Sequence, residues 1–172
     1  ALSQVSGRLE FSESALSLRE IAGGFLGGTV RVDAQMPEAG RFAVQASGRA
    51  SAAGIRNLSD NPLTAALGGT ADWRAVVEIG RGPSRLSIES DLVGLASRLP
   101  APFGKPADAA WPLRIELAPV ATAAAAGAPT RELLRIALRD DVSAVFERER
   151  DARTKRMRVL RGVFAMGSEP LM

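Results

Sequence analysis

The chain has 172 residues, which is enough for one domain or two small ones with a buried core. It has no cysteine and no histidine, so the usual parts of hydrolases and metalloenzymes are missing, and we expect no enzyme, no cofactor and no metal. The formal net charge is +3, but the arginines alternate with acidic residues and only 5% of residues are aromatic, which argues against nucleic-acid binding.

Membrane and targeting signals are also missing from the sequence. No apolar run approaches the ~20 residues of a spanning helix, and no charged and apolar leader stands at the N-terminus. The chain starts inside one strand pattern and stops soon after another. We therefore expect a segment of a longer protein, with membrane contact only through the full-length chain.

The N-terminal part alternates with the period of two that is typical of half-buried strands. Val5 to Phe11 and Ala15 to Glu20 predict the first two strands. Glycines at 23, 24, 27 and 28 then predict a tight turn or a bulge. Gly23 and Gly28 have the spacing of a phosphate-binding loop, but Thr29 follows where a lysine is required, so we reject that function.

The next part predicts a hairpin and two short helices. Thr29 to Met36 and Arg41 to Ala50 are strands, joined by a turn at 37–40. Residues 52–58 permit a helix, and Asn61 followed by Pro62 is typical of a helix start. We expect the glycines at 68 and 69 to end this second helix.

A second hairpin leads into a proline-rich connection. Thr70 to Ile79 and Arg85 to Leu92 predict its strands, with a turn at 80–84. Residues 98–106 contain three prolines and predict a stiff crossover to the next strand, whose apolar residues are Leu113, Ile115 and Leu117. The crossover should join two half-buried strands.

The C-terminal part predicts a third hairpin and a final strand. Residues 118–129 are rich in alanine and read as a loop or linker. Leu133 to Leu138 and Val142 to Glu149 predict a hairpin about Asp140 and Asp141, which we interpret as turn formers and not as an acid and base pair. Residues 150–156 form a charged turn before a last strand at 157–166.

Together these elements predict a mainly β, antiparallel chain of about nine or ten strands with two short helices. We expect a β segment at 1–118 with its helices near 52–68, a loop or linker at 119–130, and a hairpin plus final strand at 131–172. The helices are too few to cover one face of the sheet, so that face must meet another sheet or hold an apolar ligand. A closed sandwich and an open, curved groove both remain possible.

Several segments resemble the central region of the YhdP-type, AsmA-like proteins, from about Leu9 to Glu116. Most of them are turns and strand edges. They are FLGG at 25–28, VRV at 30–32, ADWR at 71–74, SDL at 90–92 with GL at 94–95, LPAPFGKP at 99–106 and WPL at 111–113. The resemblance implies a long, membrane-anchored chain whose β-strands form a hydrophobic groove in the periplasm, implicated in moving phospholipids between the inner and outer membranes.

The resemblance carries no catalytic residues. It implies phospholipid acyl chains and flanking segments of the same chain as partners, and an apolar face that lines the groove. The residues that we expect to line it are Val30, Val32, Val44, Trp73, Val77, Leu86 and Ile88. The alternative function is a non-catalytic β-sandwich spacer or protein-interaction scaffold of the cell envelope.

Overall fold

The structure is a computed structural model of the chain. It describes residues 3–11, 16–38, 41–80, 84–120, 129–151, 153–154 and 156–167. Parts of the predicted turns at 37–40, 80–84 and 150–156, and most of the predicted loop at 118–129, lie outside these residues.

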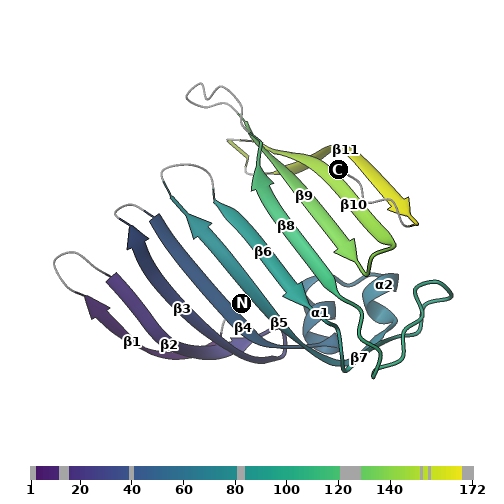
Figure 1. The fold of residues 1–172 in the computed structure, drawn as a ribbon, viewed down its shortest axis with the longest axis horizontal. Coiled ribbons are helices and arrows are strands. Elements are labelled where there is room, and N and C mark those ends of the chain that lie inside the picture. Colours follow the sequence, from purple (N-terminus) through teal and green to yellow (C-terminus); the bar gives the residue numbers. More distant parts are fainter. Residues whose placement is uncertain are drawn as a thin grey trace.

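One large antiparallel sheet makes up most of the molecule (Figure 1). Its strand order is β1-β2-β3-β4-β5-β6-β8-β9-β10-β11, and the short strand β7 pairs with β5 beside it. The first strands are β1 (Ser3–Phe11), β2 (Leu16–Phe25), β3 (Gly28–Glu38), β4 (Arg41–Ser51), β5 (Leu67–Ile79) and β6 (Arg85–Ser90). The others are β7 (Leu95–Ser97), β8 (Leu113–Pro119), β9 (Thr130–Leu138), β10 (Val142–Arg150) and β11 (Met157–Met166).

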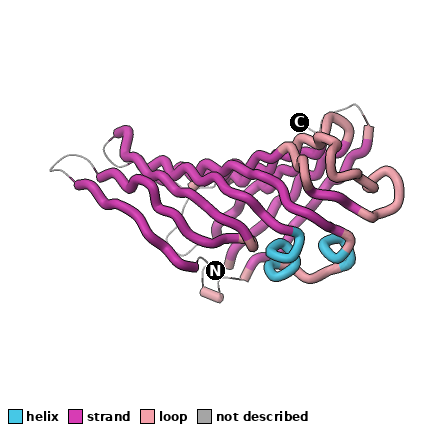
Figure 2. Tube along the Cα trace, turned by 90° about the horizontal axis from the view of Figure 1, so that it is seen from below, coloured by secondary structure: helices cyan, strands magenta, loops and turns pink. Residues whose placement is uncertain are grey.

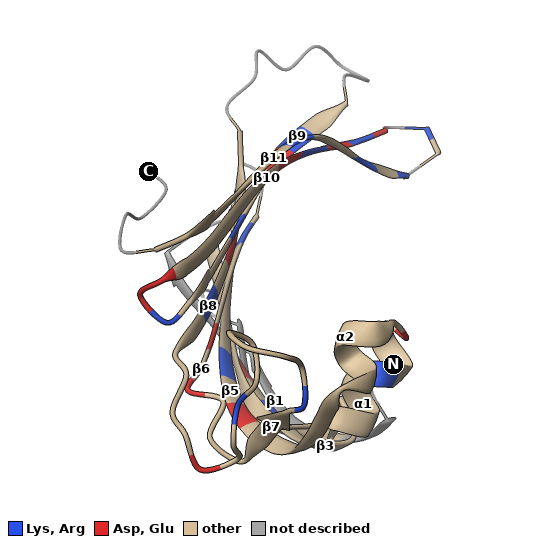
Figure 3. Cartoon of the chain, turned by 90° about the vertical axis from the view of Figure 1, so that its right-hand side faces the viewer, with Lys and Arg blue, Asp and Glu red and all other residues tan. Residues whose placement is uncertain are grey.

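The sheet is a single layer and it bends. Figure 2 shows the strands as one curved layer, with α1 (Ala52–Leu58) and α2 (Pro62–Ala65) at one end of it. Figure 3 shows that both helices lie on the inside of the bend. Within the described residues no second sheet packs on either face, so the structure shows the open alternative and not the closed sandwich.

Most of the predicted elements are confirmed. The predicted mainly β, antiparallel fold is right, and the three predicted hairpins are β3–β4, β5–β6 and β9–β10. The second helix begins as predicted: the side-chain oxygen of Asn61 accepts hydrogen bonds from the N–H groups of Leu63 at 2.9 Å and Thr64 at 3.1 Å. The proline-rich crossover lies between β7 and β8, in the connection from β6 to β8, and these two strands are direct neighbours in the sheet.

The glycine pair Gly68–Gly69 was wrongly predicted to end a helix. Both residues belong to β5 and pair with Ala96 and Leu95 of β7, a strand that the sequence analysis missed. Gly69 has a φ of +87°, and a Cβ there would overlap the carbonyl oxygen of Gly94. Glycine is needed at this point because two backbones approach closely, not because a helix stops.

Two predicted strand boundaries are also corrected. The second strand does not stop at Glu20 but continues through the glycines to Phe25, and the turn is made by Leu26 and Gly27, with φ of 52° and 73°. Positive φ at both positions matches the twist of a hairpin. The strand predicted to reach Leu92 ends at Ser90, because Leu92 has a φ of 55° and leaves the sheet.

A small core forms where α1 meets the sheet. Ala52, Ala71 and Leu95 are buried together, with relative exposures of 4%, 5% and 6%, and three half-buried residues pack around them. Two of the three are alanines, so the helix can approach the backbone of β5 closely. The core therefore closes one end of the sheet and leaves the rest of its face uncovered by helix.

The turn between β2 and β3 is tied to the start of α1. The backbone N–H of Ser51 donates to the carbonyl oxygen of Leu26 at 2.9 Å, and the Ser51 hydroxyl donates to the same oxygen at 3.3 Å. The Ser51 hydroxyl oxygen in turn accepts from the N–H of Gly54 at 3.0 Å, as a helix N-cap does. One serine thus joins a distant hairpin to the helix.

Lys105 anchors the crossover to the sheet. Its residue is only 5% exposed, and its Nζ donates to the carbonyl oxygens of Leu95 at 2.8 Å and Pro106 at 3.0 Å. The backbones of Lys105 and Ser97 also exchange two hydrogen bonds of 2.9 Å. Burial lowers the pKa of Lys105, and the charges of Asp108 and Asp91 oppose that shift only in part.

The lowered pKa of Lys105 predicts a pH-dependent stability. Between the pKa of the folded state and the ordinary value of 10.5, the unfolded chain binds more protons, so the free energy of unfolding should rise with pH across that alkaline window. Urea unfolding between pH ~8 and ~10.5 can measure the rise. The chain has no tyrosine or cysteine to titrate there. A Lys105→Met variant should lack the rise, and an equal rise in both proteins would contradict the assignment.

Candidate functional site

The strands place their apolar residues on one face, in three rows that run across the sheet. Residues paired in an antiparallel register share a face, so each row follows from the pairing. The middle row is Val32, Ala46, Ala75, Ile88, Ile115, Ile136 and Ala144. The row on the side of the middle row away from α1, which we call the rim-side row, is Ala34, Val44, Val77, Leu86, Leu117, Leu134 and Phe146.

The third row, which we call the helix-side row, lies between the middle row and α1. It runs through Val30, Gly48 and Trp73, and again through Leu113, Leu138 and Val142. Seven strands at about 4.8 Å per neighbouring pair make the rows roughly 29 Å long. We call the surface that these three rows form the apolar face.

The structure places all seven expected groove residues on this apolar face. Val30 is buried at 3% exposure, and the other six are half-buried. They are Val32, Val44, Trp73, Val77, Leu86 and Ile88. The structure also adds residues of β8, β9 and β10 to the same face, which the expected set did not include, although their alternation was visible in the sequence.

Trp73 lies beside Gly48 in the helix-side row. Its ring meets Phe25 edge to face, with centroids 5.9 Å apart, and a Cβ on Gly48 would stand 3.3 Å from the ring. The indole Nε1 is buried and has no hydrogen-bond partner. A buried donor without a partner is costly. The ring of Trp73 thus lies on the apolar face in spite of its polar N–H group.

The opposite face is charged and is also hollowed, by about 1110 Å³. Arginines and acidic residues line the hollow, and several of them form ion pairs. Arg114 contacts Glu89 at 2.9 Å, and Arg139 stacks on the Trp111 ring at 4.2 Å while its Nη2 contacts Asp141 at 2.7 Å. Because this hollow is open, polar and internally paired, it offers nothing specific to an apolar ligand.

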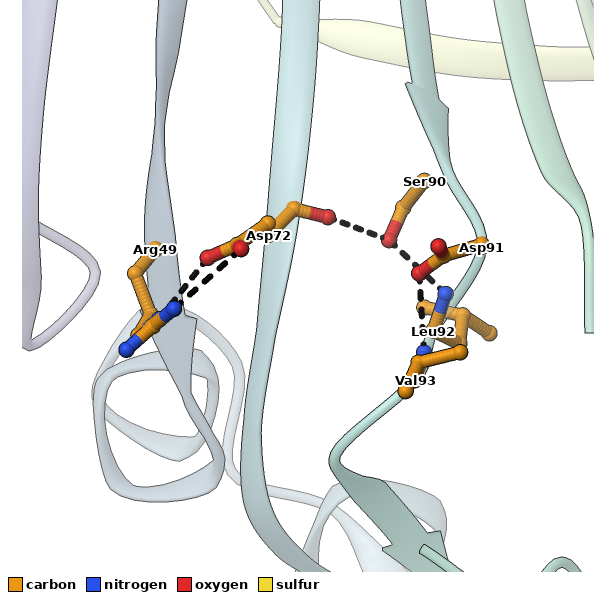
Figure 4. Close-up of polar contacts among 6 residues, drawn as sticks. All are labelled: Arg49, Asp72, Ser90, Asp91, Leu92 and Val93. Atoms are coloured by element: carbon orange, nitrogen blue, oxygen red, sulfur yellow. Dashed lines mark hydrogen bonds and ion pairs between the residues drawn. The ribbon is translucent and has the colours of Figure 1, made fainter. Parts of the chain in front are cut away.

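A bonded network holds the strand ends around the hollow (Figure 4). The guanidinium of Arg49 donates to both carboxylate oxygens of Asp72, at 2.7 and 3.2 Å, and this contact lowers the pKa of Asp72. The hydroxyl of Ser90 donates to the backbone oxygen of Asp72 at 2.6 Å and accepts from the N–H of Leu92 at 3.0 Å. The ion pair is well exposed, so it contributes little to stability, and the network reads as structural.

The described residues contain neither a metal-binding cluster nor a membrane-spanning helix. They contain no group of three or more acidic side chains placed to hold a metal ion. No described helix is long and apolar enough to cross a membrane. The apolar face is therefore the feature of the described chain that most needs a functional explanation.

The chain was compared with known families and proteins. A family model described as YhdP protein matches residues 1–171. No curated protein and no solved structure matches the chain.

Proposed function

Because the chain belongs to the YhdP protein family, we propose that its apolar face is part of a hydrophobic groove that binds or conducts phospholipids between the inner and outer membranes. The protein would be anchored in the inner membrane, and this part of it would lie in the periplasm. Its partners would be phospholipid acyl chains and flanking segments of the same chain. We propose no enzymatic activity for it.

One observation carries the proposal: two adjacent apolar rows cross seven strands, a third crosses six of them and, over most of that area, the described chain puts no second layer on them. A soluble sheet normally buries such a face against another sheet or helices. Here α1 covers only the end near Ala71. Both helices lie on the inside of the bend and α1 packs against Ala71, so the apolar face is the inner face of the curved sheet.

The energetics favour a hydrocarbon chain as the occupant. Burying a ~16-carbon chain is worth on the order of 10 kcal/mol before ordering costs, at about 0.8 kcal/mol per methylene. That gain needs no polar contact along the apolar face, which agrees with rows made almost wholly of alanine, valine, leucine and isoleucine. The rows are also longer than they are wide, as a path for an extended chain should be.

The scaffold alternative gives the apolar face a different role. A spacer or interaction module would use the apolar residues as a core, and a second protein layer would have to cover them. The described strands form one sheet with no second sheet packed on it, which favours the lipid groove over the sandwich spacer. A partner protein on the apolar face would still exclude lipid, so the decisive measurement is direct contact with lipid.

Two neighbouring valines of β5 provide a matched test. Val77 belongs to the rim-side row, whereas Val76 lies on the opposite face and is 39% exposed. Val77→Asp should clearly lower crosslinking between this part of the chain and a lipid with a photoreactive acyl chain, because it puts an unpaired charge among acyl chains. Val76→Asp introduces the same charge in the same strand, where water solvates it, and should crosslink like the parent.

The comparison is made in the full-length protein, after circular dichroism has shown that both variants fold. Equal crosslinking in the two variants would mean that the apolar face does not hold lipid. The same conclusion would follow if the parent protein, at its natural length and in its own membrane, did not crosslink at all.

A further inference from the structure

One charged pair faces the apolar side of the sheet at its rim. Glu132 of β9 pairs with Arg148 of β10 in the strand register. Each stands two residues beyond a member of the rim-side row, Leu134 or Phe146, so both share the face of that row. The residues beside them on β8 and β11, Pro119 and Val159, are apolar.

This pair is shielded more than a surface ion pair usually is. The side chains of Arg148 and Glu132 are only 23% and 14% exposed. The Nη2 of Arg148 donates to the Oε1 of Glu132, while the Nε of Arg148 is buried and has no hydrogen-bond partner. A buried donor without a partner is unfavourable, so a local rearrangement that gives Arg148 a further acceptor stabilises the site.

Arg150, two residues beyond Arg148, shares its face but is exposed, and the other charges at this end of the sheet are on the opposite face. Glu147 is 9% exposed, and its carboxylate contacts Arg161 at 2.6 Å and Arg131 at 3.7 Å. Arg131 also contacts Glu149 at 3.1 Å. These groups form ion pairs with one another across neighbouring strands. Glu132 and Arg148 are thus a separate pair of opposite charges, set next to the hydrocarbon-binding rows.

We propose that Glu132 and Arg148 bind the headgroup of a zwitterionic phospholipid, one that carries a phosphate and an ammonium group. This inference rests on the proposed function. With the acyl chains on the apolar face, a phosphate oxygen accepts from the partly exposed guanidinium of Arg148, a group well shaped for phosphate. The ammonium pairs with the carboxylate of Glu132.

The charge of Glu132 sets the selectivity of this site. A headgroup with a phosphate but no ammonium leaves the carboxylate without a new partner and adds a negative charge beside it, which is unfavourable in a shielded place. A headgroup with both charges matches the pair one for one. The rows hold hydrocarbon without regard to the headgroup, so the preference comes from the rim alone.

The test is a competition in the full-length protein between two photoreactive phospholipids with identical acyl chains. One has an ethanolamine headgroup and the other a glycerol headgroup, and they are supplied in equal amounts in mixed vesicles. The parent protein should crosslink the ethanolamine lipid at least about threefold more. Glu132→Gln should bring the ratio to about one or below, with total crosslinking changed less than twofold.

Glu147→Gln is the matched control, because it removes a carboxylate from the adjacent strand on the opposite face and should leave the ratio unchanged. Equal crosslinking of the two lipids by the parent protein would overturn the headgroup site and leave the groove standing. So would a ratio that Glu132→Gln does not change. Absence of crosslinking to either lipid would instead overturn the groove, and the headgroup site with it.

Discussion

Replacing Gly54 with alanine should lower the free energy of unfolding by about 3 kcal/mol or more. Gly54 is buried in α1, and a Cβ there would overlap the backbone carbonyl group of Leu26 in the turn between β2 and β3. Backbone cannot move aside as the end of a side chain can. The clash should therefore exceed the gain of about 1 kcal/mol that alanine brings to an ordinary helix position.

Gly68→Ala provides the control for this prediction. A Cβ at Gly68 would meet nothing within 4 Å, so the same substitution should change stability by less than about 1 kcal/mol. Urea unfolding followed by circular dichroism measures both variants. If Gly54→Ala were as stable as Gly68→Ala, then α1 and the turn between β2 and β3 would not be in contact.

Replacing Leu95 with alanine should lower the free energy of unfolding by about 3 kcal/mol. Leu95 is the large side chain of the small core between α1 and the sheet, where it is 6% exposed and packs with Ala52 and Ala71. Alanines cannot collapse into the space that it leaves. The cavity should therefore add its own cost to the lost burial of the leucine side chain.

Leu58→Ala makes the same chemical change at a site that is 73% exposed, on the same helix that Leu95 packs against. It should cost less than about 1 kcal/mol. Urea unfolding of the two variants under identical conditions gives the comparison. Equal losses would show that the contact between α1 and β7 does not stabilise the fold.

Most of the sheet could be predicted because its strands carry a clear period of two. In β3, β4, β5 and β10 the apolar residues alternate with polar ones, and Trp73 and Val77 share one face of β5 as expected. β7 could not be found in this way. It has three residues, and its pairing depends on Gly69 and Leu95 meeting across 26 positions of the chain, which no local pattern records.

The candidate site could be predicted only in part, for a similar reason. Alternation identified which valines and leucines share a face, but not that the face is open, because a closed sandwich has the same pattern. The pair of Glu132 and Arg148 was hidden too. In the sequence these residues look like ordinary members of a charged hairpin, and only the register places them beyond Leu134 and Phe146.

The order of the strands determines how a change in one strand of the proposed groove would affect the binding and the movement of lipid. Nearly every strand lies beside its neighbour in the chain, with only β7 set aside from that order. Each row is therefore a series of side chains from successive strands. The side chains of a row contribute additively to lipid binding. The loss of one of them therefore weakens binding only in proportion. Movement of a lipid along the row requires every strand in turn. One blocked strand would therefore stop the movement while the rest of the row still bound lipid.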